Sequence, residues 1–150
     1  MALKARIKDE MKAALLSGDR FVGETLRNLT AAILDEEVKL GKRDEGLSDE
    51  EIEKVVAREV KKRNESAKIY RDNNRPDLAE PEEREIEILQ AYLPKQLDET
   101  ELTAIIEAKI AELSVTGPQA MGQVIGAVKK QVGNAADGAV IARIVKQKLN

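Results

Sequence analysis

The sequence of 150 residues predicts an all-α protein. Apolar residues recur at the three- and four-residue spacing of amphipathic helices along nearly the whole chain, and the alternation typical of half-buried strands is absent. Several segments also open with a helix-capping side chain and close with glycine or proline. We expect an N-terminal domain (residues 1–94), a bundle of about four helices of which one is long, and a compact C-terminal domain of three helices (residues 95–150).

The N-terminal helices are delimited by local capping signals. The first is expected to stop at Gly18, because glycine readily takes the left-handed conformation that ends a helix, and Asp19 can cap the second. Ser48 and Glu51 have the spacing of a capping box, in which each side chain bonds the other residue's amide. This box predicts a third, long helix from about residue 49 to 73.

The apolar face of the long helix is interrupted by Glu59 and Arg63. Their four-residue spacing favours an ion pair within the helix, with the arginine stem covering apolar neighbours, over an arginine that contacts a ligand. Pro76 and Pro81 break the pattern that follows. We expect the fourth helix to begin after Pro81, where three glutamates suit the positive end of a helix dipole.

The C-terminal domain carries the same kind of signals. Asp98 and Glu101 form a second capping box at the start of the fifth helix. Gly133 is expected to end the sixth helix, and Asp137 to cap a seventh that runs from about residue 138 to 149.

The predicted sixth helix carries three glycines on one face. At about 100° per residue, Gly122, Gly126 and Gly133 share a stripe with Lys129, next to the apolar stripe. Each glycine costs about 1 kcal/mol relative to alanine inside a helix, so something is expected to approach the backbone closely. We favour tight packing against another helix; the alternative is a ligand, with a phosphate held by Lys129.

The composition limits the possible chemistry. Charged residues make up 35% of the chain and hydrophobic residues 42%, a balance typical of soluble globular proteins. The chain has no histidine and no cysteine, which excludes histidine-dependent triads, cysteine nucleophiles and thiolate metal sites. No phosphate-binding loop motif occurs. We therefore expect no enzyme activity, no catalytic residue, no metal and no cofactor.

The net charge of −3 conceals two basic zones, residues 58–75 and 114–150. Either zone could meet an anionic partner, although most charged helix faces are simply solvated. One Phe, two Tyr and no Trp give no platform for stacking bases, so a nucleic acid would be recognised through backbone and shape. The side chains expected to contact a nucleic acid are those of Lys129, Lys130, Arg143 and Lys146. Its backbone is expected to approach closely at Gly122, Gly126 and Gly138. A secondary basic zone consists of Lys61, Lys62 and Arg63.

A series of motifs runs in order through the whole chain. They are Met11-Lys12-Ala13-Ala14, Gly18-Asp19-Arg20, Leu26-Arg27-Asn28-Leu29, Glu59-Val60-Lys61-Lys62-Arg63-Asn64-Glu65-Ser66, Arg75-Pro76-Asp77-Leu78-Ala79, Tyr92-Leu93-Pro94-Lys95-Gln96-Leu97, Met121-Gly122-Gln123-Val124-Ile125-Gly126 and Ala136-Asp137-Gly138. Together they resemble the YqeY-like family, whose fold is shared with the C-terminal helical region of GatB, a subunit of tRNA-dependent amidotransferase. Asn73-Asn74 departs from the family's usual small-residue and glycine pair.

The resemblance implies a two-part helical protein. In amidotransferases the matching region of GatB binds tRNA, and catalysis takes place in another part of that subunit. The family's carbon-nitrogen ligase label, with glutamine as amido donor, then applies by association only. We expect a stand-alone, non-catalytic tRNA-binding accessory protein. The alternative is a protein-protein adaptor that docks an aminoacyl-tRNA synthetase or an amidotransferase. No apolar run approaches the length of a membrane span, so we expect no membrane partner and a cytoplasmic location.

Overall fold

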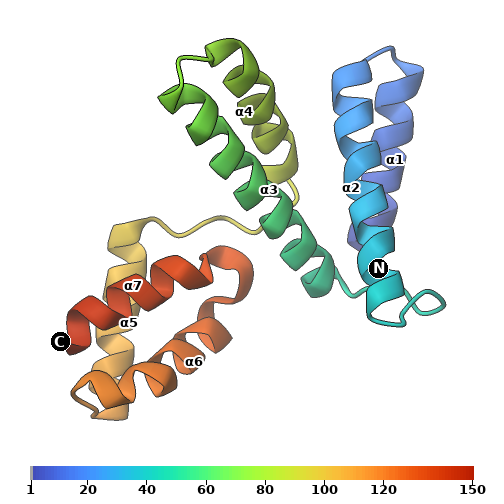
Figure 1. The fold of residues 1–150 in the computed structure, drawn as a ribbon. Helices are drawn as coiled ribbons and strands as arrows, with labels where there is room; N and C mark the ends of the chain where they lie inside the picture. The colour runs from blue at the N-terminus through green and yellow to red at the C-terminus, as the bar shows by residue number, and fades with distance from the viewer. Residues whose placement is uncertain (1) are drawn as a thin grey trace. The chain divides into compact units, whose positions relative to one another are not determined.

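A computed structural model describes residues 2–150, which form seven α-helices, two short 3₁₀ helices and no strand (Figure 1). The predicted all-α class is confirmed. The chain divides into two compact units, Met1–Leu93 and Pro94–Asn150, and each is built around its own apolar cluster.

The N-terminal unit consists of two helical hairpins. Helices α1 (Ala2–Leu16) and α2 (Arg20–Lys39) form the first, and α3 (Asp49–Asp72) and α4 (Pro76–Gln90) form the second (Figure 1). As predicted, Gly18 takes a positive φ of 84° after α1, and the Asp19 side chain accepts a hydrogen bond from the Val22 amide. In the second hairpin Asn74 adopts a φ of 57°, a left-handed conformation that asparagine tolerates better than most residues.

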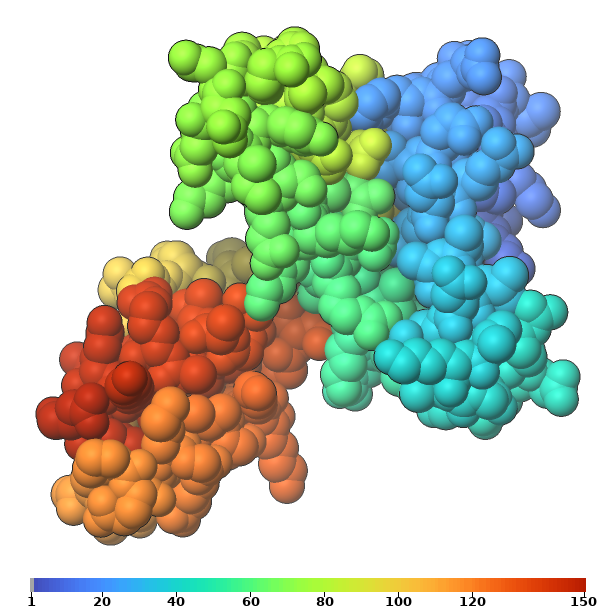
Figure 2. All heavy atoms as spheres, viewed as in Figure 1, coloured from blue at the N-terminus to red at the C-terminus, as the bar shows by residue number. Residues whose placement is uncertain are grey.

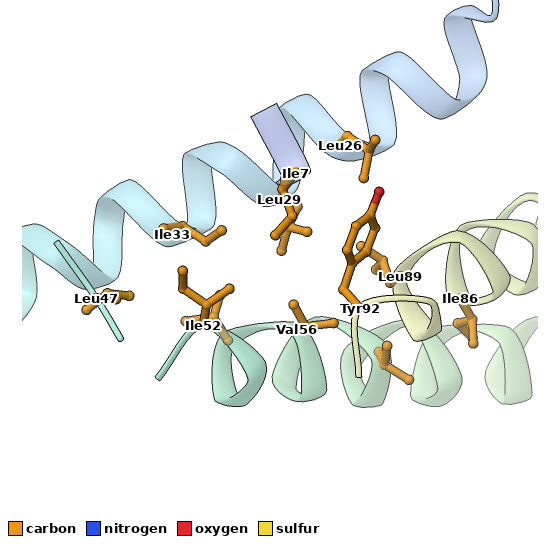
Figure 3. Packing of buried hydrophobic residues seen from close by; sticks show 12 residues of the cluster. Ile7, Leu26, Leu29, Ile33, Leu47, Ile52, Val56, Ile86, Leu89 and Tyr92 are labelled. Atoms are coloured by element: carbon orange, nitrogen blue, oxygen red, sulfur yellow. The ribbon is translucent and has the colours of Figure 1, made fainter. Parts of the chain in front are cut away.

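The two hairpins share one core. Figure 3 shows Leu29 and Ile33 of α2 facing Ile52 and Val56 of α3, with Tyr92 beside them. All five side chains are buried. Burying each aliphatic side chain contributes roughly 1.5–3 kcal/mol, so this layer stabilises the contact between the hairpins.

Helix α4 begins earlier than predicted. Pro76 occupies its first turn, where the missing amide leaves no helical hydrogen bond unmade, and Pro81 lies inside the helix. The expectation that α4 starts after Pro81 is therefore wrong. Helix α4 continues through Pro81, which is exposed, and packs along α3.

The C-terminal unit contains α5 (Glu99–Leu113), α6 (Met121–Val132) and α7 (Gly138–Leu149), with 3₁₀ helices η1 (Pro118–Ala120) and η2 (Gly133–Ala135) on either side of α6. Asp137 caps α7 as predicted, because its side chain accepts from the Ala139 amide. The capping box predicted for α5 forms only in half: the Asp98 side chain accepts from the Glu101 amide, but the Glu101 side chain accepts no bond from the Asp98 amide within residues 2–150. Gly133 ends α6 with a φ of 55°.

A polar contact holds the last part of the N-terminal unit in place. The Tyr92 hydroxyl donates to the Glu10 carboxylate of α1, and the guanidinium of Arg6 lies 4.7 Å from the centre of the tyrosine ring. Burial raises the pKa of Tyr92, and the hydrogen bond to Glu10 raises it further. The same hydrogen bond lowers the pKa of Glu10. Tyr92 therefore fixes the segment that precedes Pro94 against α1.

Replacement of Tyr92 by phenylalanine is expected to lower the free energy of unfolding by about 1 kcal/mol, the net worth of one hydrogen bond. Urea unfolding followed by circular dichroism measures the change. Tyr70→Phe is the matched control, because the Tyr70 hydroxyl forms no hydrogen bond within residues 2–150. Equal effects of the two substitutions would contradict a stabilising role for the Tyr92 hydroxyl.

The predicted capping box at the start of α3 is present. Ser48 Oγ accepts from the Glu51 amide at 3.2 Å, and Glu51 Oε1 accepts from the Ser48 amide at 3.1 Å. Lys42 Nζ also donates to Glu51 Oε2 at 2.7 Å. The lysine hydrogen bond, followed by that of the Ser48 amide, lowers the pKa of Glu51 from 4.5 to about 2.

This lowered pKa predicts an acid-dependent loss of stability. Because the folded carboxyl titrates below its ordinary value, its contribution is complete above about pH 4.5, declines as the pH falls, and is lost as the pH passes about 2. The stability difference between wild type and Glu51→Gln should therefore shrink across this window. Urea unfolding at a series of pH values measures it, and a pH-independent difference would contradict the assignment.

Candidate functional site

Helix α6 exposes the face that carries its glycines. Val124 and Val128 are fully buried on its opposite side, within the cluster of the C-terminal unit. A Cβ atom placed on Gly122 or Gly126 would meet no atom within 4 Å. Within the C-terminal unit, the interpretation that another helix packs tightly against these two glycines is therefore wrong. We call Gly122 and Gly126 the glycine face.

No atom of the C-terminal unit packs against the glycine face. Gly133, the third member of the stripe, has a structural role, because its positive φ ends α6. Gly122 and Gly126 instead lie within a regular helix, where each is less favourable than alanine by up to about 1 kcal/mol. A surface of bare backbone kept at this cost suits a close external contact.

Lys129 lies next to the first residue of α7. Its Cε and Nζ atoms are 3.2 and 3.3 Å from the position that a Cβ of Gly138 would occupy. Gly138 thus leaves room for the lysine to cross the start of α7, where the Asp137 carboxylate caps the Ala139 amide. Atoms of α6 and α7 lie side by side on the face drawn in Figure 2, in orange and red. The edge formed by α6 and α7 therefore carries Lys129 beside the start of α7.

The other predicted contacts of the C-terminal unit fall into two groups. Lys130 and Lys146 are exposed, and within residues 2–150 no carboxylate pairs with either of them or with Lys129. Arg143 instead donates to Glu99 of α5 at 2.8 Å. The fold therefore leaves three lysines available to an anion, whereas Arg143 already has a carboxylate partner.

The residues of the secondary basic zone differ in burial. Lys61 and Lys62 are exposed on α3, but Arg63 is only 12% exposed. Its guanidinium donates to Glu59 at 3.1 Å, as predicted, and also to Glu85 of α4 at 2.5 Å. Burial opposes the charge of Arg63, yet the two carboxylates outweigh it and raise its pKa. Arg63 therefore joins α3 to α4 and is held away from any external anion.

Sequence reasoning missed the carboxylates that face α7. Glu99 pairs with Arg143, and Glu107 pairs with Lys148 at 2.7 Å. Glu99 and Arg143 are 44 residues apart in the chain, and no local spacing signals a contact over that distance.

Within the described chain, no group of three or more histidine, cysteine, aspartate or glutamate residues is arranged to hold a metal ion. None of the helices in residues 2–150 combines the length and apolar character needed to cross a membrane.

The model of the Yqey-like protein family matches residues 4–149. The chain belongs to this family. Among curated proteins, it is 32% identical over 144 residues to "Altered inheritance of mitochondria protein 41, mitochondrial" of Eremothecium gossypii, covering 91% of this chain and 77% of that protein. The protein of the same name in Lachancea thermotolerans is 29% identical over 116 residues, and the match spans 76% of this chain but only 61% of the relative.

These relatives correct one expectation from the sequence. They are named as mitochondrial proteins, as is the Clavispora lusitaniae relative, which is 33% identical over 101 residues, 65% of this chain and 57% of that protein. The expected cytoplasmic location is therefore wrong. It rested on the lack of long apolar segments, which does not distinguish the cytosol from the interior of an organelle.

Replacing a glycine of the glycine face by alanine is expected to stabilise the C-terminal unit. Gly126→Ala should raise the stability of the C-terminal unit by about 1 kcal/mol, because the added methyl group favours the helix and touches nothing. Gly23→Ala is the contrast, since its Cβ would lie 2.7 Å from Leu15 Cγ in a buried contact; we expect a loss of about 1 kcal/mol or more. Native-state hydrogen exchange of each unit measures both changes. A loss of stability in Gly126→Ala would contradict the open face.

Proposed function

We propose that this member of the Yqey-like protein family is a non-catalytic accessory module that binds tRNA through the edge formed by α6 and α7. The observation that carries the proposal is the glycine face, a stretch of solvent-exposed helix backbone with nothing in the C-terminal unit packed against it. A sugar-phosphate backbone can approach such a surface more closely than a face covered by side chains.

The charges around the glycine face support an anionic ligand. Lys129 lies on the same stripe of α6, and Lys130 and Lys146 are exposed without a carboxylate partner in the described chain. Lysine side chains are common phosphate contacts in nucleic-acid complexes.

The ligand is expected to be recognised by its backbone rather than by stacking of its bases. The one Phe and both Tyr of the chain lie before residue 94, so the C-terminal unit offers no aromatic platform. The resemblance to the GatB C-terminal region supports tRNA as the nucleic acid.

The second candidate function is docking of a protein partner such as a synthetase or an amidotransferase. The glycine face also favours this function, because a partner helix can pack closely against bare backbone. The two functions differ in their dependence on salt: phosphate contacts release counterions, whereas close helix packing is largely apolar.

Replacement of both Lys129 and Lys130 by alanine tests the proposal. Binding of the full chain to labelled bulk tRNA is measured by fluorescence anisotropy across a salt series. Wild type should bind more weakly as salt rises. The double variant should bind less tightly, with a salt slope reduced by about two, because each lysine neutralises about one phosphate.

The matched control is Lys8→Ala with Lys12→Ala, which removes two exposed lysines of α1 and changes the net charge equally. It should affect binding less than the α6 pair. If both double variants weakened tRNA binding equally, the binding would depend on net charge alone and the proposed site on α6 would be wrong. Wild type that fails to bind tRNA at low salt would refute the RNA function, and capture of a protein partner that Gly126→Leu abolishes would then establish the adaptor.

A further inference from the structure

Helix α5 presents an acidic surface in the unit whose other two helices are basic. All four glutamates of α5 are exposed. Two of them, about two turns apart, form ion pairs with α7. Glu99 Oε1 accepts from Arg143 Nη2 at 2.8 Å, and Glu107 Oε1 forms an ion pair with Lys148 Nζ at 2.7 Å. Two of the cations of α7 are thereby occupied by carboxylates.

Both contacts are weak enough to be exchanged. The side chains of Arg143 and Glu99 are 46% and 62% exposed, and those of Lys148 and Glu107 are 39% and 54% exposed. Ion pairs in such positions contribute little to folding because water and salt screen them. A phosphate can take the place of the carboxylate, and a guanidinium binds phosphate in a favourable two-pronged geometry.

We propose that carboxylates of α5 compete with RNA phosphates for cations of α7. In the free protein Glu99 and Glu107 pair with Arg143 and Lys148, and phosphates of the RNA replace the two carboxylates on binding. This inference rests on the proposed RNA-binding function and adds its regulation. The carboxylates occupy these two cations in the free protein and so lower the affinity for anions. A ligand must present several phosphates at once to displace them, which disfavours isolated anions.

The decisive experiment compares two neutralised glutamates of α5. Glu99→Gln should tighten binding of the full chain to bulk tRNA by about two- to five-fold and increase the salt slope, because Arg143 becomes available. Glu101→Gln is the matched control: it also lies exposed in the first turn of α5, it changes the charge equally, and its side chain pairs with no cation in the described chain. Glu107→Gln repeats the test at the second contact.

A second experiment in an Arg143→Ala background distinguishes release of Arg143 from a general gain of positive charge. In an Arg143→Ala background, Glu99→Gln should tighten binding no more than Glu101→Gln does. If Glu99→Gln and Glu101→Gln changed the affinity for tRNA equally in the wild-type background, the proposed competition by Glu99 would be wrong. If neither wild type nor any glutamine variant bound tRNA, the RNA function itself would fail; binding by wild type with no advantage for Glu99→Gln would overturn only this inference.

Discussion

Helix α6 can bury only one side, and the direction of that burial determines the character of the C-terminal unit. Val124 and Val128 fill the cluster shared with α5 and α7, which turns Gly122 and Gly126 to solvent. The same rotation brings Lys129 to the start of α7. A bare, positively charged helix surface follows from this packing, and the proposed RNA contact depends on it.

The distribution of ion pairs, more than net charge, distinguishes the two basic zones. In residues 58–75 the arginines serve the fold: Arg63 joins α3 to α4 through Glu85, and Arg71 pairs with Glu83. In the C-terminal unit Lys129 has no such partner in the described chain. In residues 58–75 these arginines are thus paired with carboxylates of the same unit, whereas three lysines of the C-terminal unit stay available to an anion.

The sequence predicted the features that depend on neighbouring residues. The caps at Asp19, Ser48 and Asp137 need only a side chain and an amide two or three residues away, and all three are present. The prediction failed at Pro81, where α4 continues through the proline and packs along α3, a long-range contact that the local pattern does not contain.

The candidate site was only partly predictable for the same reason. The pattern of α6 placed its glycines on one stripe, but whether a third helix covers that stripe depends on tertiary packing. The pairing of Arg143 with Glu99 likewise joins positions 44 residues apart. Long-range contacts of this kind decide which cations stay available, and no spacing in the sequence encodes them.

The proposed function requires RNA to contact the glycine face. The most direct test is a titration of the ¹⁵N-labelled full chain with bulk tRNA, followed through the backbone amide signals of the glycines. We expect the signals of Gly122, Gly126 and Gly138 to shift or broaden first, while those of Gly18 and Gly41, which lie in turns of the N-terminal unit, change little. Early changes at Gly18 and Gly41 with unchanged signals at Gly122 and Gly126 would contradict the proposed function.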